Sequence, residues 1–433
     1  MLEPTLTVDM MVVLGLLGLA IVLFVTEVVR IDVAALLVLV LIGLVPLVPG
    51  LDPLVAPGEL FAGFASNAVV SIMAVMVLGA GLDRAGVMQK AAAAVLRVGG
   101  TTEARVIATV SGTVGVISSF MQNIGAAALF LPVVRRVAER TGRPLSRLLM
   151  PMGFAAIVGG TITMVGSSPL ILLNDLMPED LEPFALFDVA PVGLALLVAT
   201  ILYFVLLGRF VLPAHTATAG SSAQAEALRP AEAAPSGKTP QALGFLALSL
   251  ALILFTDLSL SLALMAGALG MVLTGVIGMD EAYRAISWKT VFLLAGLIPL
   301  GLAVETTGTA AWIATTTLDL LGTVPSWVLQ AVFFALTTFF TLVMSNVGAT
   351  VLLVPLAVNI ALAAQGMGVD ADPRVFAMIV GIATSNAFVL PTHQVNALLM
   401  DEGGYRVKDF VRAGGGMTVL YAIVALVAIN LVF

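Results

Sequence analysis

Long apolar stretches separated by short polar segments run from one end of the chain to the other. Ten of them have roughly the length of a membrane-crossing helix, about 17–25 residues. They are residues 10–29, 31–49, 64–82, 148–173 and 187–210 in the first half and 242–256, 258–278, 288–304, 373–399 and 413–433 in the second. Because lipid cannot satisfy backbone polar groups, each stretch is expected to be a helix. The pattern predicts an all-α polytopic membrane protein, with the first stretch retained rather than cleaved as a signal peptide.

A further apolar run, residues 106–134, is long for one crossing and barely long enough for two. Arg105 precedes it, and Arg135 and Arg136 follow it. Basic residues that flank membrane helices remain cytoplasmic, so both ends of the run are expected on that side. The run then forms a re-entrant hairpin over residues 105–135, with its tip near Gln122–Gly125. One long tilted helix is the alternative.

A second run, residues 326–361, lies between segments that carry almost no basic residues, and we expect it to be a hairpin that enters from outside. With this topology, 18 of the 19 lysines and arginines fall on the cytoplasmic side and only Arg374 lies outside. Both termini are then external. Each half holds five crossings and one hairpin, and an odd number of crossings inverts the second half relative to the first.

The two predicted hairpins carry the same motif. Residues 119–126 read Ser-Phe-Met-Gln-Asn-Ile-Gly-Ala, and residues 342–349 read Leu-Val-Met-Ser-Asn-Val-Gly-Ala. Asn123 and Gly125 therefore correspond to Asn346 and Gly348 at one constant offset along the chain. Inverted repeats with interrupted helices are typical of secondary transporters, whose substrate binds near the middle of the bilayer.

Composition narrows the function further. Apolar residues make up 60% of the chain and charged residues 10%, against about a quarter charged in soluble domains. The chain has no cysteine and two histidines, which excludes thiolate chemistry and disfavours a histidine-rich metal site. We find no nucleophile or acid–base constellation at lipid depth, so we expect neither an enzyme nor an organic cofactor, and no nucleic-acid partner.

Four interruptions of the apolar pattern are candidates for a binding site: Gln122–Gly125, Gly166–Pro169, Ser345–Gly348 and Asn386–His393. Glycine and proline break the helical hydrogen-bond ladder, which lipid depth tolerates around a cavity or within protein packing. Freed N–H groups at helix N-termini attract anions, and freed carbonyls with Asn, Ser and Thr oxygens suit Na⁺. The alternative is that these small residues only let helices pack closely.

The coupling ion follows from the scarcity of buried acids. Proton coupling usually needs a carboxylate or histidine deep in the membrane. Asp83 and Glu305 lie at the ends of predicted spans, whereas His393 lies on a helix interruption and could titrate. The pattern favours Na⁺ over H⁺.

At this point the chain resembles the divalent anion:sodium symporter family of the ion transporter superfamily. The most specific stretch is residues 385–400, Ser-Asn-Ala-Phe-Val-Leu-Pro-Thr-His-Gln-Val-Asn-Ala-Leu-Leu-Met. The resemblance covers nearly the whole chain. It implies a homodimer in the inner (plasma) membrane that carries sulfate or a dicarboxylate with Na⁺ by an elevator motion.

The resemblance also implies roles for single residues. In the family each hairpin tip reads Ser-Asn-Thr, so Asn123 and Asn346 would contact both Na⁺ and substrate. The implied Na⁺ ligands are Ser118, Asn123, Thr341 and Asn346, with backbone around Gly166 and Ala387; the implied substrate contacts are Gln122, Asn123, Ile124, Ser168, Ser345, Asn346, Val347 and Thr392. Ile124 and Val347 replace the family's threonines, which indicates a smaller, differently shaped or less polar anion.

The chain is thus expected to divide into scaffold parts, transport parts and a linker. Residues 1–104 and 244–325 form the scaffold, and residues 105–211 and 326–433 form the transport part, with broken helices over 148–173 and 373–399. Residues 212–243, rich in Pro, Ser and Ala, form a flexible cytoplasmic linker. Segments 84–100 and 306–321 are surface helices or plain connections.

The sequence therefore predicts a sodium-coupled symporter of a small divalent oxyanion. A cation/proton antiporter or an arsenite-type efflux carrier of the same superfamily is the first alternative. A channel or a receptor that does not transport is the second.

Overall fold

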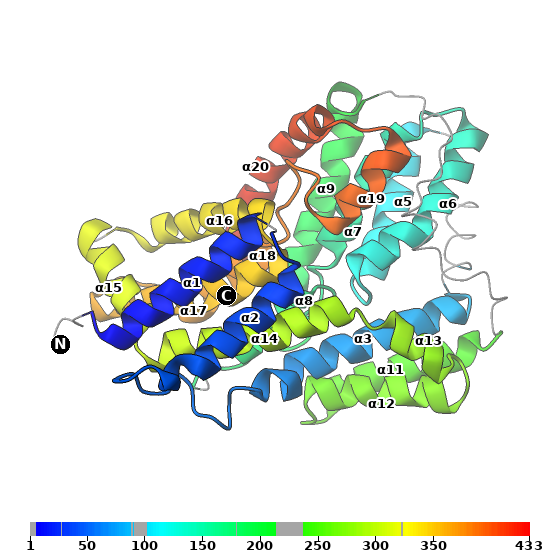
Figure 1. Ribbon diagram of the computed structural model, residues 1–433. Coiled ribbons are helices and arrows are strands. Elements are labelled where there is room, and N and C mark those ends of the chain that lie inside the picture. Colours follow the sequence, from blue (N-terminus) through cyan, green and yellow to red (C-terminus); the bar gives the residue numbers. More distant parts are fainter. Residues whose placement is uncertain are drawn as a thin grey trace.

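The computed structural model describes residues 6–26, 28–87, 90, 102–178, 180–213, 237–321 and 324–433, and its regular elements are helices (Figure 1). The first half contains α1 (Val8–Thr26), α2 (Ile31–Leu44), η1 (Val45–Leu47), η2 (Ala62–Ala65), α3 (Asn67–Arg84), α5 (Glu103–Ser118), α6 (Asn123–Thr141), α7 (Ser146–Gly159), α8 (Ser168–Leu176) and α9 (Ala190–Val211). The second half contains α11 (Thr239–Phe255), α12 (Leu260–Leu273), α13 (Met279–Ala285), α14 (Trp288–Thr306), α15 (Thr309–Leu321), α16 (Ser326–Val343), α17 (Asn346–Gly366), α18 (Pro373–Ala383), α19 (Gln394–Gly403) and α20 (Val407–Val432).

Apolar surface confirms the membrane character of these helices. Within the described residues, seven helices are long and apolar enough to cross a bilayer: α1, α3, α9, α14, α16, α17 and α20. On α20 the side chains of Val419, Ile423, Val427 and Leu431 follow one another at helical spacing and are all exposed. A soluble monomer rarely exposes such a continuous apolar stripe, whereas a bilayer accommodates it.

Several helix contacts recur when the two halves are exchanged. The predicted repeat pairs α3, α5, α6, α7, α8 and α9 with α14, α16, α17, α18, α19 and α20. Helix α8 packs against α17 and α18, and its counterpart α19 packs against α6 and α7. Helix α3 packs against α12, α14 packs against α2, and α9 packs against α20. The second segment of each interrupted helix therefore lies in the other half of the protein.

Helix ends show where the sequence predictions hold and where they are wrong. The four predicted interruptions are present, at residues 119–122, 160–167, 344–345 and 384–393. The prediction placed Asn123 and Asn346 within the hairpin tips. In the structure they are instead the first residues of α6 and α17. Residues 239–243 of the predicted linker belong to α11, because Pro240 suits the first turn of a helix. The rest of the linker, from 214 to 236, and most of segment 84–100 lie outside the described residues.

Ion pairs join residues that the charge pattern assigns to the same side of the membrane. Arg147 contacts Glu103 at 3.0 Å, which links two segments predicted to be cytoplasmic. Arg135 contacts Glu402, again within the predicted cytoplasmic set. Arg374, the one base predicted outside, contacts the acidic loop residue Glu182 at 3.1 Å. The packing thus agrees with the relative sides deduced from charge.

Candidate functional site

A hydroxyl in the first half lies against two oxygens at the interruption between α5 and α6. Ser118 ends α5 and is fully buried. Its Oγ lies 2.9 Å from Asn123 Oδ1 and 2.6 Å from the backbone oxygen of Ala156 in α7. A serine hydroxyl carries one proton and so donates to only one of these acceptors at a time.

The second half repeats the pair of hydroxyl and amide oxygen, but its backbone oxygen comes from Thr384, whereas the sequence offset pairs Ala156 with Ile379. Thr341 Oγ1 lies 2.9 Å from Asn346 Oδ1 and 2.7 Å from the backbone oxygen of Thr384. Thr341 is 1% exposed. Ser118 and Asn123 are separated from their counterparts by the same offset along the chain. The predicted Na⁺ residues of each half are therefore brought together as a hydroxyl and an amide oxygen in hydrogen-bonding distance.

Each cluster brings three oxygens together around a single hydroxyl proton, and this arrangement suits a cation. The backbone oxygens come from the C-terminal ends of helices, since α7 ends at Gly159 and α18 at Ala383. The last carbonyls of a helix have no partner within it and carry its negative dipole end. Neutral oxygen ligands of this kind suit hard cations such as Na⁺ and leave no acid to titrate.

The sequence-based prediction named backbone around Gly166 and Ala387 and did not name the carbonyls of Ala156 and Thr384. The Gly166 oxygen and the Asn123 amide both lie within 3.0 Å of the place that a Cβ atom on Gly160 would take. The oxygen of Ala387 accepts a hydrogen bond of 2.8 Å from Asn396 Nδ2, and within the described residues no hydrogen bond joins it to the second cluster. A carbonyl can come from any residue type, so no side-chain signal marks Ala156 or Thr384.

The predicted substrate residues lie at the starts of four helices. Gln122 and Ile124 flank the first residue of α6 and are half-buried; Ser345 and Val347 flank the first residue of α17; Ser168 begins α8; and Thr392, which is exposed, precedes α19. Ser345 Oγ accepts from Gly348 N at 3.0 Å, and His393 Nδ1 accepts from Val395 N at 3.2 Å. The positive ends of these helices favour an anion.

Buried polar contacts join the interruptions to one another. Thr163, between α7 and α8, donates to the backbone oxygen of Ser119 between α5 and α6. Asn386, between α18 and α19, donates to Thr338 of α16 at 3.2 Å. Tyr421 of α20 donates to the oxygen of Ile382 at 3.0 Å and interacts with the side chains of Thr161 and Ser385, one from each half. These contacts join three of the four interruptions, residues 119–122, 160–167 and 384–393, in the interior.

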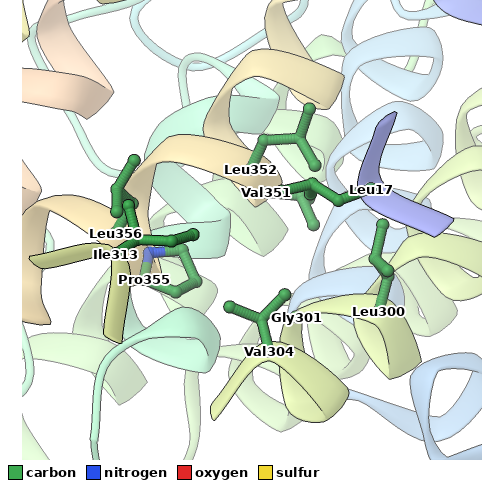
Figure 2. A pocket seen from close by; sticks show the side chains of 9 residues that line it. All are labelled: Leu17, Leu300, Gly301, Val304, Ile313, Val351, Leu352, Pro355 and Leu356. Atoms are coloured by element: carbon green, nitrogen blue, oxygen red, sulfur yellow. The ribbon is translucent and has the colours of Figure 1, made fainter. Parts of the chain in front are cut away.

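Other features of the described part do not compete with this region. No group of three or more His, Cys, Asp or Glu side chains occurs there that could hold a metal ion. A pocket between α1, α14, α15 and α17 is lined by apolar residues and suits no anion (Figure 2); its lining is Leu17, Leu300, Gly301, Val304, Ile313, Val351, Leu352, Pro355 and Leu356.

Several known proteins similar to this chain are named as transporters. An uncharacterized transporter of Synechocystis sp., sll0640, is 25% identical over 97% of this chain and 96% of that protein. A probable sodium/sulfate cotransporter 3 of Chlamydomonas reinhardtii is 31% identical, over only 23% of this chain and 12% of that protein. The crystal structure of the YdaH transporter of Alcanivorax borkumensis matches 95% of this chain and 98% of that chain, with a TM-score of 0.61 and 16% identity, which shows a shared fold.

These similarities confirm the resemblance to anion:sodium symporters and point to transport rather than to an enzymatic reaction. The family model that matches the chain is that of a citrate transporter. Since residues 21–381 of the 433 match it, this protein belongs to the citrate transporter family, CitMHS.

Proposed function

We propose that this protein is a sodium-coupled symporter of a small oxyanion. The observation that carries the proposal is the repeated cluster of a hydroxyl, an asparagine oxygen and a helix-end carbonyl, at Ser118–Asn123–Ala156 and Thr341–Asn346–Thr384. Each cluster would hold one Na⁺. The name of the Chlamydomonas relative, a sodium/sulfate cotransporter, supports this coupling ion.

The anion would bind between the two clusters, at the starts of α6, α8, α17 and α19. Dipoles, amides and hydroxyls would hold it together with the field of bound Na⁺, since the residues that begin these four helices include no Lys or Arg. Sulfate and dicarboxylates are the classes that the relative's name and the family resemblance suggest, and the family description adds citrate. Ile124 and Val347 would make this site less polar than one with two threonines.

Transport would follow an elevator motion of two inverted repeats. The helix contacts that recur on exchange of the halves, such as α8 with α17 and α18 and α19 with α6 and α7, support a twofold relationship between them. In this proposal residues 105–211 and 326–433 move against a scaffold of residues 1–104 and 244–325, and the segment between α9 and α11 joins the two halves. The termini face outward in the plasma membrane, and the homodimer that the resemblance implies is held by the scaffold.

A second candidate is a cation/proton antiporter or an arsenite-type efflux carrier. His393 is the observation in its favour, because it lies between α18 and α19 and keeps Nδ1 as an acceptor for Val395 N. In the tautomer that this bond requires Nε2 carries the proton, so a second proton would add to Nδ1 and break the hydrogen bond from Val395 N. This function predicts transport that follows a pH gradient and is lost in His393→Gln.

Thermal unfolding of the purified protein tests the symporter. Sulfate, succinate and citrate are added in sodium chloride and in choline chloride at equal ionic strength. A ligand at about 100 times its dissociation constant stabilises the folded state by about 2.7 kcal/mol, so at least one anion should raise the unfolding temperature by several degrees in sodium only. Stabilisation by no anion, or equal stabilisation in choline, would overturn the proposal.

A further inference from the structure

The two candidate cation clusters differ at one neighbouring residue, which is Gly160 in the first half. Gly160 follows the last residue of α7 with an ordinary helical φ of −63°. A Cβ atom there would lie 2.3 Å from Asn123 Oδ1, 3.0 Å from Asn123 Nδ2 and 3.0 Å from the oxygen of Gly166. Glycine is therefore required for space and not for backbone conformation. It lets the Asn123 amide and the Gly166 carbonyl approach the same point.

The second half has a methyl group at the equivalent position. Thr161 donates to Val158 O and Thr384 donates to Gly381 O, each at 2.7 Å, so the two interruptions correspond at the same offset as the two asparagines. Gly160 then corresponds to Ala383, which ends α18 and is fully buried. Asn346 cannot rest against the backbone there in the way that Asn123 does.

The halves also differ in which carbonyls are free to bind a cation. Among the described residues no hydrogen bond to Gly166 O is formed, whereas Ala387 O accepts from Asn396 Nδ2. The counterpart of Asn396 in the sequence repeat is Asn174. Its side chain instead pairs with the backbone of Phe184, at 2.8 Å and 2.9 Å, outside the interruption.

Each cluster holds three oxygens in contact: Ser118 Oγ, Asn123 Oδ1 and Ala156 O in the first, and Thr341 Oγ1, Asn346 Oδ1 and Thr384 O in the second. In the first half the backbone oxygen of Gly166 approaches Gly160 together with the Asn123 amide, whereas in the second half Asn396 holds the backbone oxygen of Ala387. Oxygens already held in place spare a bound ion the cost of ordering them. The cluster of the first half is the better prepared of the two.

We propose that the two cation sites are inequivalent. The site of the first half binds Na⁺ before the other site and more tightly. Gly160 is the residue that gives the first site its higher affinity. The site of the second half is completed when Asn396 releases the carbonyl of Ala387. This inference rests on the proposed sodium coupling. It adds an order of binding and a positioning residue that acts through Asn123.

Sodium titration without any added anion tests the inequivalence. The unfolding temperature of the purified protein is followed from low to high NaCl, with choline chloride holding the ionic strength constant. The wild type should show two phases, with midpoints separated by at least tenfold. Gly160→Ala should remove the low-sodium phase, because its methyl displaces Asn123 Oδ1, and should keep the high-sodium phase.

Ala383→Gly is the matched control, since it alters the equivalent position in the opposite sense, and it should keep the low-sodium phase. Ser118→Ala and Thr341→Ala provide a second comparison should Gly160→Ala not fold: the first should weaken the low-sodium phase and the second only the high-sodium phase. One phase in the wild type, or equal effects in each matched pair, would overturn the inequivalence while leaving sodium coupling in place. No sodium effect in the wild type would instead remove the proposed coupling, and this inference with it.

Discussion

Ser118 Oγ and Asn123 Oδ1 lie 2.9 Å apart across the interruption between α5 and α6. The Ala156 carbonyl is the third oxygen of the same cluster, 2.6 Å from the serine hydroxyl. At a helix C-terminal end, an excess of hydrogen-bond acceptors over protons favours a bound cation. Without a cation, the oxygens repel one another.

Loss of either asparagine oxygen should weaken Na⁺ binding. A hydrogen bond or contact to a charged group contributes about 1.5–3 kcal/mol, which corresponds to roughly 10–100-fold in a dissociation constant. Asn123→Ala and Asn346→Ala should therefore each need much more sodium for anion binding, measured by isothermal titration calorimetry. Asn359→Ala is the control, because this residue lies on α17 and bonds only the Pro355 carbonyl one turn away among the described contacts. Unchanged sodium dependence in both site variants would move the cation sites elsewhere.

Hydroxyls at Ile124 and Val347 should improve the binding of strongly hydrated anions. Val347 is 9% exposed and Ile124 is half-buried, so an added hydroxyl has few competing partners. Val347→Thr keeps the shape of the side chain, and its unsatisfied group should lower stability without ligand by about 1 kcal/mol and recover this when an anion is bound. The measurement is the affinity for sulfate and succinate in sodium. Val347→Ala controls for the lost methyl groups, and an equal change in both variants would argue against a contact with the anion.

The contact between Arg135 and Glu402 should contribute to stability. The Glu402 side chain is fully buried, whereas that of Arg135 is 30% exposed. Arg135→Gln takes a cation away from a buried carboxylate and should cost about 3 kcal/mol in the free energy of unfolding. Arg135→Gln combined with Glu402→Gln should restore most of the loss. If the double variant is as unstable as the single one, the charge pair is not the cause.

The pH dependence of stability should contain a contribution from Asp175. Its carboxylate, at the end of α8, accepts a hydrogen bond of 2.9 Å from Ala68 N at the start of α3. Burial raises the pKa of Asp175 above its ordinary value of 3.8, although the hydrogen bonds from Ala68 and Ser66 oppose the shift. The folded state then binds the proton more tightly than the unfolded state.

The sign of this contribution follows from the raised pKa. The stabilisation is fully present below 3.8 and is lost as the pH rises through the folded-state pKa. Asp175→Asn keeps an oxygen that can accept from Ala68 and does not titrate. The difference in unfolding temperature between wild type and Asp175→Asn should therefore fall as the pH rises above about 4. A difference that stays constant, or that rises with pH, contradicts the raised pKa.

The sequence predicts the side chains of the candidate site better than its backbone groups. The repeat that carries Asn123 and Asn346 marks the interruptions, because amide and glycine residues are costly inside an apolar helix unless they serve packing or binding. The same repeat places Ser118 and Thr341 at equal distances before the two asparagines. The apolar helices and the four interruptions follow from the hydrophobic pattern and the helix breakers.

The backbone partners could not be predicted in this way. Ala156 and Thr384 are 38 and 43 residues away in sequence from the residues whose hydroxyls contact their backbone oxygens. Every residue type has a backbone carbonyl, so the sequence does not show which carbonyl takes part. The role of Gly160 depends on the position of Asn123 in three dimensions. Asn174 and Asn396 occupy equivalent places in the sequence and still bond different groups, Phe184 and Ala387.

The central claim is that sodium bound at these two clusters drives the uptake of an oxyanion. Its most direct test is uptake of radiolabelled sulfate and succinate into proteoliposomes that contain the purified protein. With an inward sodium gradient and equal pH on both sides, uptake of at least one of them should exceed that in an equal potassium gradient, and Asn123→Ala should abolish the difference. Uptake that follows an imposed pH gradient and ignores sodium would contradict the account.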